Sequence, residues 1–498
     1  MNRTGKTFLA LGIIVATSGI VGFLMLNRGH DWGDDFAAYI LQAQALVRGN
    51  IHELLRHSEF TIDHSPGTVG LTSYPWGLPL LLAPVYAAFG LDPLAFKLVL
   101  TASYMLFLVA YFLLARTRLT NAESLLLTAF MAFNASLLRA QNQIFADFPF
   151  LAWSTVSLWL IERYVNTESP PARSVTAGIA IGLSIFMAAL TRFNGLLLLV
   201  PLALAQFQHR RSTSPLAGRP SGTLGLVAIP YAAFAICYGL QALVLPSKLG
   251  GLQYAFDGFS GRLLLHHAAY YFVVTGRLLQ ESGLGFGSFA LLFTFLVLRL
   301  SALRREDAPM LLYSVATLAY YVLYPPLQGP RFIYPILPVF FLLAFDGMRV
   351  AVRRLRPGSQ NSVMLAICIV WAGMAAVALG VSVTDARSNL AAHREAPSGP
   401  FSPGAAAMFS FIRRSSPADS VVIFFKPRAM RLFTDRDSFL TWYCADLPQG
   451  DYVVIMQDEG IFNQVPPSSI RNCVSVSLAN VFEQDNIVVY QISPPLPP

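Results

Sequence analysis

The sequence predicts a polytopic α-helical membrane protein of about eleven transmembrane helices, followed by a small extracytoplasmic α/β domain. Hydrophobic residues make up 55% of the 498 residues and charged residues only 12%, where a soluble chain carries about 25% charge. So little charge cannot cover the surface of a water-soluble protein of this size. Apolar stretches near the roughly 20 residues needed to cross a bilayer recur along residues 1–383.

Eleven apolar stretches are candidates for spanning helices. The basic N-terminal end resembles a signal peptide, but no small-residue cleavage site follows before Trp32, so we expect an uncleaved first helix. An odd number of spans places the two termini on opposite sides of the membrane. The predicted spans are 7–26, 94–115, 122–138, 147–164, 174–190, 193–207, 223–245, 285–300, 309–324, 332–348 and 361–383.

The basic residues indicate the orientation of these spans. Alternate connections are rich in arginine, and the positive-inside rule places them in the cytoplasm. The net charge of +8 is therefore an orientation signal in a cell inner membrane, and we expect no nucleic-acid partner. Residues 27–93, 246–284 and the tail from Thr384 are then extracytoplasmic. The basic connections include Arg3, Lys6, Arg116, Arg118, Arg299, Arg304, Arg349 and Arg353.

The first outer loop, residues 27–93, is expected to be structured. Phe36–Val47 has the apolar spacing of a helix, and Asp34 and Asp35 stand at its start, where carboxylates suit the helix N-terminus. Turn-forming residues follow at His64–Gly67. Pro75–Phe89 is apolar but short and rich in proline, which favours an interfacial or re-entrant helix over a span.

Beyond the spans, the composition changes. Residues 384–403 have the composition of a linker, and residues 404–498 are expected to form the small α/β domain, outside a membrane domain that occupies residues 1–383. Cys444 and Cys473 are the only cysteines of this tail, so a single pairing is available in an oxidising compartment. The elements predicted here are a helix over Ala405–Arg413 and strands over Val421–Phe425, Tyr452–Met456 and Ile487–Ile492.

Asp34 and Asp35 are the first candidates for catalysis. Ionisable groups beside a membrane are costly, and a carboxylate at the outer surface can act as general base on an acceptor hydroxyl. A plain helix cap is the alternative for this pair, and also for Asp147 at the outer start of a predicted span.

The segment Trp32–Gly49, W-G-D-D-F-x-x-Y-x-x-x-A-x-x-L-x-x-G, resembles the first outer loop of GT-C glycosyltransferases. These include protein O-mannosyltransferases, aminoarabinose transferases of lipid A and RgtA/B/C/D-like bacterial transferases, whose first loop carries a catalytic aspartate. The spacing to Tyr39 favours Asp35 as that residue, whereas the spacing to Gly49 favours Asp34. Other segments similar to these families are Tyr74–Pro79, Ala146–Pro149, Thr191–Gly195, Arg331–Pro335 and Phe425–Arg428.

The resemblance implies a GT-C fold and an inverting glycosyltransferase. Its donor would be a sugar on a polyprenyl phosphate, and its acceptor an envelope glycolipid such as lipopolysaccharide, a polysaccharide or a protein. Arg192 and Arg331 fall at outer helix ends, where a guanidinium suits the leaving phosphate. The alternative for both arginines is contact with lipid headgroups.

Substrate binding is assigned to a further set of outer residues. His266 and His267 are adjacent, but no other ligands stand at metal spacing, so we expect neither a metal site nor another cofactor. A transporter or flippase of lipid-linked sugars is the alternative function. It would need charges along its spans, whereas most charges here cluster at their ends. The assigned substrate-binding residues are His64, Tyr74, Asp147, Tyr334 and His267.

Overall fold

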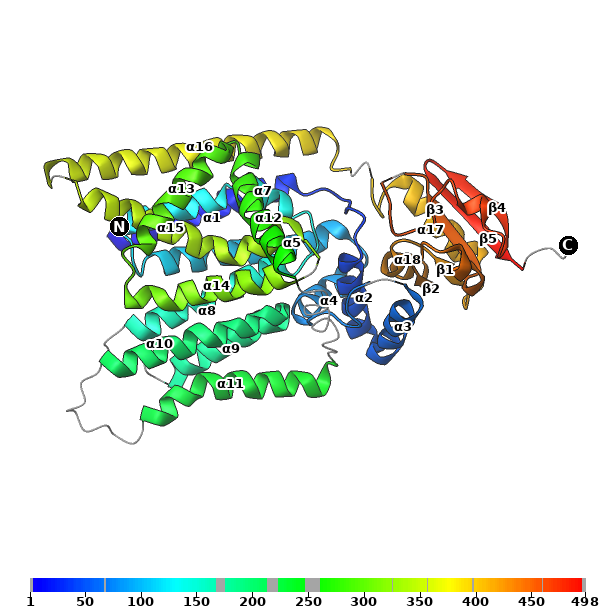
Figure 1. Ribbon diagram of the computed structural model, residues 1–498, viewed down its shortest axis with the longest axis horizontal. Coiled ribbons are helices and arrows are strands. Elements are labelled where there is room, and N and C mark those ends of the chain that lie inside the picture. The colour runs from blue at the N-terminus through cyan, green and yellow to red at the C-terminus, as the bar shows by residue number, and fades with distance from the viewer. Residues whose placement is uncertain are drawn as a thin grey trace.

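A helical membrane region and a small tail domain lie end to end in the computed structural model (Figure 1). The structure describes residues 3–66, 69–166, 175–212, 223–246, 260–324, 326–355, 357–395, 398–458 and 460–494. The N-terminus lies at the end of the membrane region that is farthest from the tail domain (Figure 1). The outer-loop helices lie between the two parts.

A helix forms over each predicted span. Five of the described helices are both long and apolar enough to cross a membrane: Thr4–Met25, Pro93–Ala115, Leu226–Val244, Gly329–Arg353 and Gln360–Ala391. The others are too short or not apolar enough. The helices of this region are α1 (Arg3–Met25), α5 (Pro93–Ala115), α6 (Asn121–Ala132), α7 (Ala135–Ala140), α8 (Asp147–Asn166), α9 (Val175–Thr191), η2 (Phe193–Leu198), α10 (Leu199–Ser212), α11 (Thr223–Val244), α13 (Gly285–Leu300), η4 (Arg305–Asp307), α14 (Ala308–Leu323), η5 (Gly329–Ile336), α15 (Leu337–Arg353), η6 (Pro357–Ser359) and α16 (Gln360–Ala391).

Two predicted boundaries differ from the structure. The span predicted over 122–138 is interrupted, because the Asn134 side chain accepts a hydrogen bond from the backbone N–H of Leu137 and so begins a new helix, α7. The last span does not end at Val383, because α16 continues to Ala391 and contains the first part of the predicted linker.

The outer loop contains three helices. α2 (Asp35–Arg48) and α4 (Gly77–Phe89) occupy the two segments predicted as helices, and they pack on each other. α3 (Ile51–His64) was not predicted. Gly49, with φ 71°, ends α2 in the left-handed conformation that favours glycine. α12 (Gly261–Glu281), in the predicted outer segment 246–284, begins at Ser260, whose hydroxyl accepts from the Leu263 backbone N–H.

The tail domain has a five-stranded sheet in the order β2-β1-β3-β5-β4. β1 is parallel to β2 and β3, whereas β5 is antiparallel to β3 and β4. The predicted first strand ends early, at Ile423. The cysteine pairing is confirmed, because a disulfide joins Cys444 to Cys473. The tail elements are α17 (Pro403–Ser415), β1 (Val421–Ile423), α18 (Pro427–Thr434), β2 (Asp437–Phe439), η7 (Cys444–Gln449), β3 (Tyr452–Met456), η8 (Ile470–Asn472), β4 (Ser477–Gln484) and β5 (Ile487–Ser493).

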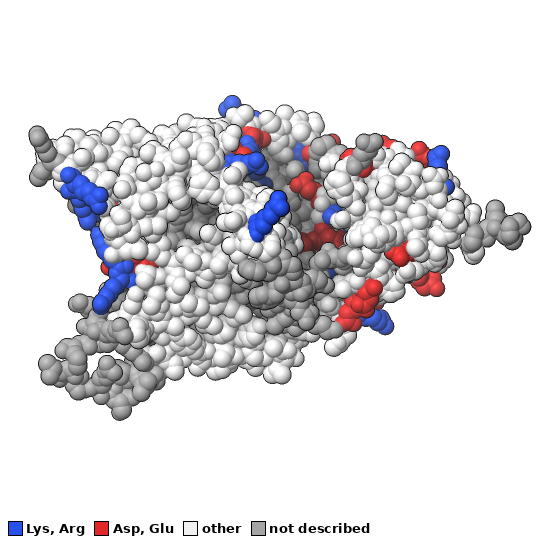
Figure 2. All heavy atoms as spheres, viewed as in Figure 1, with Lys and Arg blue, Asp and Glu red and all other residues white. Residues whose placement is uncertain are grey.

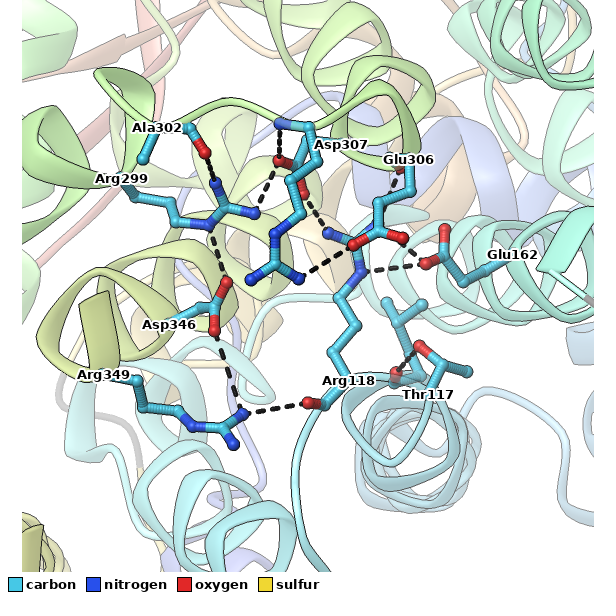
Figure 3. A network of polar contacts seen from close by, with 11 residues as sticks. Thr117, Arg118, Glu162, Arg299, Ala302, Glu306, Asp307, Asp346 and Arg349 are labelled. Carbon is cyan, nitrogen blue, oxygen red and sulfur yellow. Dashed lines mark hydrogen bonds and ion pairs between the residues drawn. The ribbon is translucent and has the colours of Figure 1, made fainter. Parts of the chain in front are cut away.

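A buried ionic network ties helices together in the membrane region (Figure 3). Arg118, which follows α5, pairs with Glu162 of α8 and with Asp307 of η4. Arg299 of α13 bonds Asp307 and also Asp346 of α15, each at 2.6 Å. Arg299 and Asp307 have no exposed side-chain surface. These charges neutralise one another within the protein, so the network is a structural junction between helices.

Candidate active site

A cavity of about 590 Å³ opens between the membrane helices and the tail domain. Acidic side chains show in the hollow between these two parts of the molecule (Figure 2). The segments that line the cavity come from the outer loop, from the starts of α8 and η2, from the ends of α9 and α14, from η5 and from the tail domain. Its charged and polar lining includes Asp34, Asp35, Tyr74, Asp147, Arg192 and Arg331.

Asp35 is held by two side chains from distant parts of the chain. Its Oδ1 accepts a hydrogen bond of 2.6 Å from the hydroxyl of Tyr74, and its Oδ2 lies 3.1 Å from Nη2 of Arg331. Burial alone would raise the pKa of Asp35. The Arg331 guanidinium and the Tyr74 hydroxyl outweigh that effect and hold this pKa below its ordinary value. Asp35 is therefore ionised at neutral pH.

Asp34 has a different set of contacts. It occupies the position before α2, as predicted, but its side chain makes no capping hydrogen bond to that helix. Its Oδ1 instead accepts from the backbone N–H groups of Arg428, at 3.0 Å, and Ala429, at 3.4 Å, in the first turn of α18. Burial raises the pKa of Asp34, and the nearby cations Arg428 and Lys426 oppose that rise only in part. Asp34 thus caps a helix of the tail domain.

Arg428 completes this contact between the tail domain and the outer loop. Its Nη2 donates to the carbonyl of Leu71 at 2.7 Å, and its Nη1 donates to the carbonyl of Val69. Nη1 also lies 3.5 Å from the hydroxyl oxygen of Tyr74, the residue that bonds Asp35. Only 4% of the Arg428 side chain is exposed. Tyr74 therefore links Arg428 of the tail domain to Asp35.

The two arginines predicted to bind phosphate lie in the same cavity. Arg192 forms an ion pair with Asp147, and its guanidinium lies 5.0 Å from the ring centre of Phe332. Arg331 lies 4.4 Å from the ring centre of Phe145 while it pairs with Asp35. Each guanidinium therefore forms an ion pair with one carboxylate and lies near an aromatic ring. Such a group can exchange its carboxylate for a phosphate without leaving its position.

The other predicted substrate-binding residues are not all brought together. Tyr334 lines an adjoining cavity of about 320 Å³ that also includes Asp147 and Arg331. His64 and His267 do not line either cavity. His64 stacks on Phe60 within α3 and bonds that residue's carbonyl. His267 is buried against the carbonyl of Val322.

Among the described residues, no group of three or more His, Cys, Asp or Glu side chains is arranged to hold a metal ion. Lys426 and Gln328 line the main cavity and were not predicted to do so. The resemblance of Phe425–Arg428 to a family segment was the only signal for Lys426, and local patterns give no sign that this segment faces Asp34.

Comparison with known proteins identifies the fold. No protein-family model and no curated protein matches the chain. Solved structures do match. ArnT from Cupriavidus metallidurans, in the apo state, aligns over 98% of this chain and 98% of its own, with 14% identity and a TM-score of 0.59. The same protein bound to undecaprenyl phosphate aligns over the same shares, with 15% identity and a TM-score of 0.56.

A second solved protein has the same architecture. The apo oligosaccharyltransferase of Archaeoglobus fulgidus aligns over 95% of this chain and 73% of its own, with 12% identity and a TM-score of 0.60. At these identities the likeness is one of fold, and it extends through both the membrane region and the tail domain. The chain is therefore a membrane protein of the GT-C fold, the fold of ArnT and of the archaeal oligosaccharyltransferase, as its first outer loop predicts.

Proposed function

We propose that this protein is an inverting glycosyltransferase that moves a sugar from a polyprenyl phosphate to an acceptor of the cell envelope. The observation that carries this proposal is the Asp35–Arg331 pair, an ionised carboxylate and a guanidinium that share one cavity in a GT-C fold. One structural relative is bound to undecaprenyl phosphate. Another, from Archaeoglobus fulgidus, holds a dolichol-phosphate and an inhibitory peptide.

The proposed reaction is a single displacement. Asp35 accepts a hydrogen bond from the acceptor hydroxyl and takes its proton as the oxygen attacks the anomeric carbon. The bond from that carbon to the phosphate oxygen breaks, polyprenyl phosphate leaves, and the configuration at the carbon inverts. Asp35 is a weak base because its pKa is low, so much of its effect comes from orienting the hydroxyl and stabilising developing positive charge.

Positive charge for the leaving phosphate comes from the protein in this proposal. Arg192 and Arg331 lie on the same cavity as Asp35 and are assigned to the phosphate. Tyr74 and Tyr334 are assigned to substrate binding, and Asp147 to substrate binding or to holding Arg192. No cofactor takes part, so we expect treatment with EDTA to leave turnover unchanged. A loss of turnover that added Mg²⁺ or Mn²⁺ restores would contradict this part of the proposal.

The proposed location is the inner membrane, with eleven spans, the N-terminus in the cytoplasm and the tail domain outside. Lys and Arg side chains gather at the end of the membrane region where the N-terminus lies, away from the candidate site (Figure 2). This distribution follows the positive-inside rule if that end is cytoplasmic. Reporter fusions after Ser382 should be active outside the cytoplasm, and a cytoplasmic signal would overturn this orientation.

The acceptor and the sugar can be found by mass spectrometry of envelope glycans and glycolipids. A strain lacking the protein should lose one glycan modification, and the wild-type gene should restore it while an Asp35→Asn variant does not. Purified protein should then release polyprenyl phosphate as it transfers sugar. Movement of a lipid-linked sugar across the membrane without transfer would support the transporter alternative instead.

A further inference from the structure

Lys426 is a cation of the tail domain that faces the candidate active site. It is the residue before α18, and it lines the cavity that contains Asp35 and Arg192. The backbone around it is fixed, because Asp34 accepts from the N–H groups of the two residues at the start of α18. Lys426 is thus held at the cavity by a fixed stretch of backbone.

The charges around Lys426 are otherwise paired. Arg331 contacts Asp35 and Arg192 contacts Asp147. Arg428, behind the cavity wall, lies 3.8 Å from Oδ2 of Asp34. In the described part of the chain, Lys426 has no carboxylate within ion-pair distance, and its ammonium nitrogen lies 5.6 Å from the ring centre of Phe425. Among the three cations that line the cavity, Lys426 is therefore the one without an ion pair in the described part of the chain, although its charge also acts on Asp34.

The start of α18 does not supply an alternative anion site. A helix N-terminus attracts anions through its free N–H groups and its dipole. Here Asp34 already occupies two of those N–H groups. An anion that enters beside α18 must therefore find its positive charge on a side chain, and Lys426 is the side chain that the cavity offers.

We propose that Lys426 binds a phosphate group of a substrate in this cavity, so that the tail domain supplies part of the substrate site. A lysine ammonium binds phosphate as a point charge with three donors, whereas Arg192 and Arg331 must first release carboxylates. This inference rests on the proposed function. Two phosphates fit the same chemistry: the one that leaves with the polyprenol, and one carried by the acceptor.

The experiment measures binding to the purified full-length protein in detergent, without turnover. The variants are Lys426→Gln, which removes the charge, and Lys426→Arg, which keeps it. The probes are undecaprenyl phosphate, and lipid A with and without its phosphate groups. Arg471→Gln is the matched control, because it removes one exposed positive charge from the same domain. Arg471 lines neither cavity of the site.

We expect Lys426→Gln to weaken binding of the phosphate-bearing probe by roughly 10- to 100-fold, the worth of one charge-assisted contact. Lys426→Arg and Arg471→Gln should stay close to wild type. If Lys426→Gln binds undecaprenyl phosphate more weakly, Lys426 contacts the phosphate of the leaving group. If the variant binds only phosphorylated lipid A more weakly, and binds the dephosphorylated form as wild type does, Lys426 contacts a phosphate of the acceptor.

Two results would contradict the inference in different ways. If Lys426→Gln binds every probe as wild type does, while the wild-type protein transfers sugar, Lys426 does not bind phosphate and the proposed function stands. If the wild-type protein binds no probe and transfers no sugar, the proposed function fails and this inference fails with it. Melting temperatures of the variants separate lost binding from lost folding, and we expect them to be unchanged because Lys426 has no ion pair to lose.

Discussion

The carboxylate of Asp34 accepts a hydrogen bond from the backbone N–H of Arg428 at 3.0 Å, across a sequence separation of 394 residues. The next residue, Asp35, faces Tyr74 and Arg331 instead. The two adjacent carboxylates therefore have different partners. Asp34 joins the outer loop to the tail domain, and Asp35 is left to face the cavity with its charge intact.

Asp35→Asn should lower turnover by roughly 10²- to 10⁴-fold, because it removes the anion that accepts the proton while it keeps the size of the side chain. Asp34→Asn is the matched control. Asparagine is a good helix cap, so this variant should keep most of its activity. Rates of sugar transfer and melting temperatures of both variants test this division of roles. Equal losses in the two variants would contradict it.

Arg331→Gln should change the pH dependence of the reaction. Arg331 lowers the pKa of Asp35 from its ordinary value of 3.8, so the anion persists above that lowered pKa and is lost as the pH falls through it. Without Arg331 the pKa of Asp35 rises, because burial then acts with less opposition. The acid limb of the kcat/KM profile should move toward neutral pH, and Arg331→Lys should partly restore it. An acid limb at the wild-type position would show that the pair does not set this pKa.

Arg428→Gln should loosen the tail domain from the outer loop. The variant loses charge-assisted hydrogen bonds to the carbonyls of Val69 and Leu71, each worth on the order of 1.5–3 kcal/mol. We expect faster proteolysis between α16 and α17 and a lower turnover, because Tyr74 and Lys426 lose their support. Arg413→Gln, an exposed arginine of the same domain, is the control. Unchanged proteolysis in Arg428→Gln would mean that other contacts hold the domain.

Removal of the disulfide should destabilise the tail domain alone. The bond joins Cys444 to Cys473, with a sequence separation of 29, and closing a loop of this size is worth roughly 3 kcal/mol in the chain-entropy model. The Cys444→Ser/Cys473→Ser double variant should lower the unfolding temperature of the tail and leave the helical membrane region folded. Circular dichroism, together with proteolysis of the tail, measures the two parts separately. Simultaneous loss of both parts would contradict this independence.

Asp307→Asn should destabilise the membrane region, because it leaves Arg118 and Arg299 buried with one carboxylate less. Breaking such a buried pair costs about 3–5 kcal/mol. Glu306→Gln is the neighbouring control, since its pair with Arg304 is 42–46% exposed and worth about 1 kcal/mol or less. The melting temperature in detergent should fall only in Asp307→Asn, while the KM for the donor stays unchanged. If Glu306→Gln lowered the melting temperature by the same amount, the buried pairs of Asp307 would not be what stabilises the membrane region.

Local patterns predicted much of the fold. The helix over Phe36–Val47 and the strand over Tyr452–Met456 were predicted because the spacing of their apolar residues is visible in a short stretch of sequence. α3 was missed because its apolar residues are few and its sequence is polar and histidine-rich. The break at Asn134 was missed because the apolar stretch continues through it.

The sequence by itself determined the membrane class, the placement of most helices and the one pairing open to the two tail cysteines, since chain length, apolar runs and a count of cysteines are enough for these. That the two cysteines are bonded was shown by the structure. Only the tertiary structure decided that Asp34 caps α18, that Asp35 pairs with Arg331, and that Lys426 faces the cavity. The physical reason is that the pKa of a carboxylate and the partner of a cation depend on groups within a few ångströms in space. Here those groups lie hundreds of residues away along the chain.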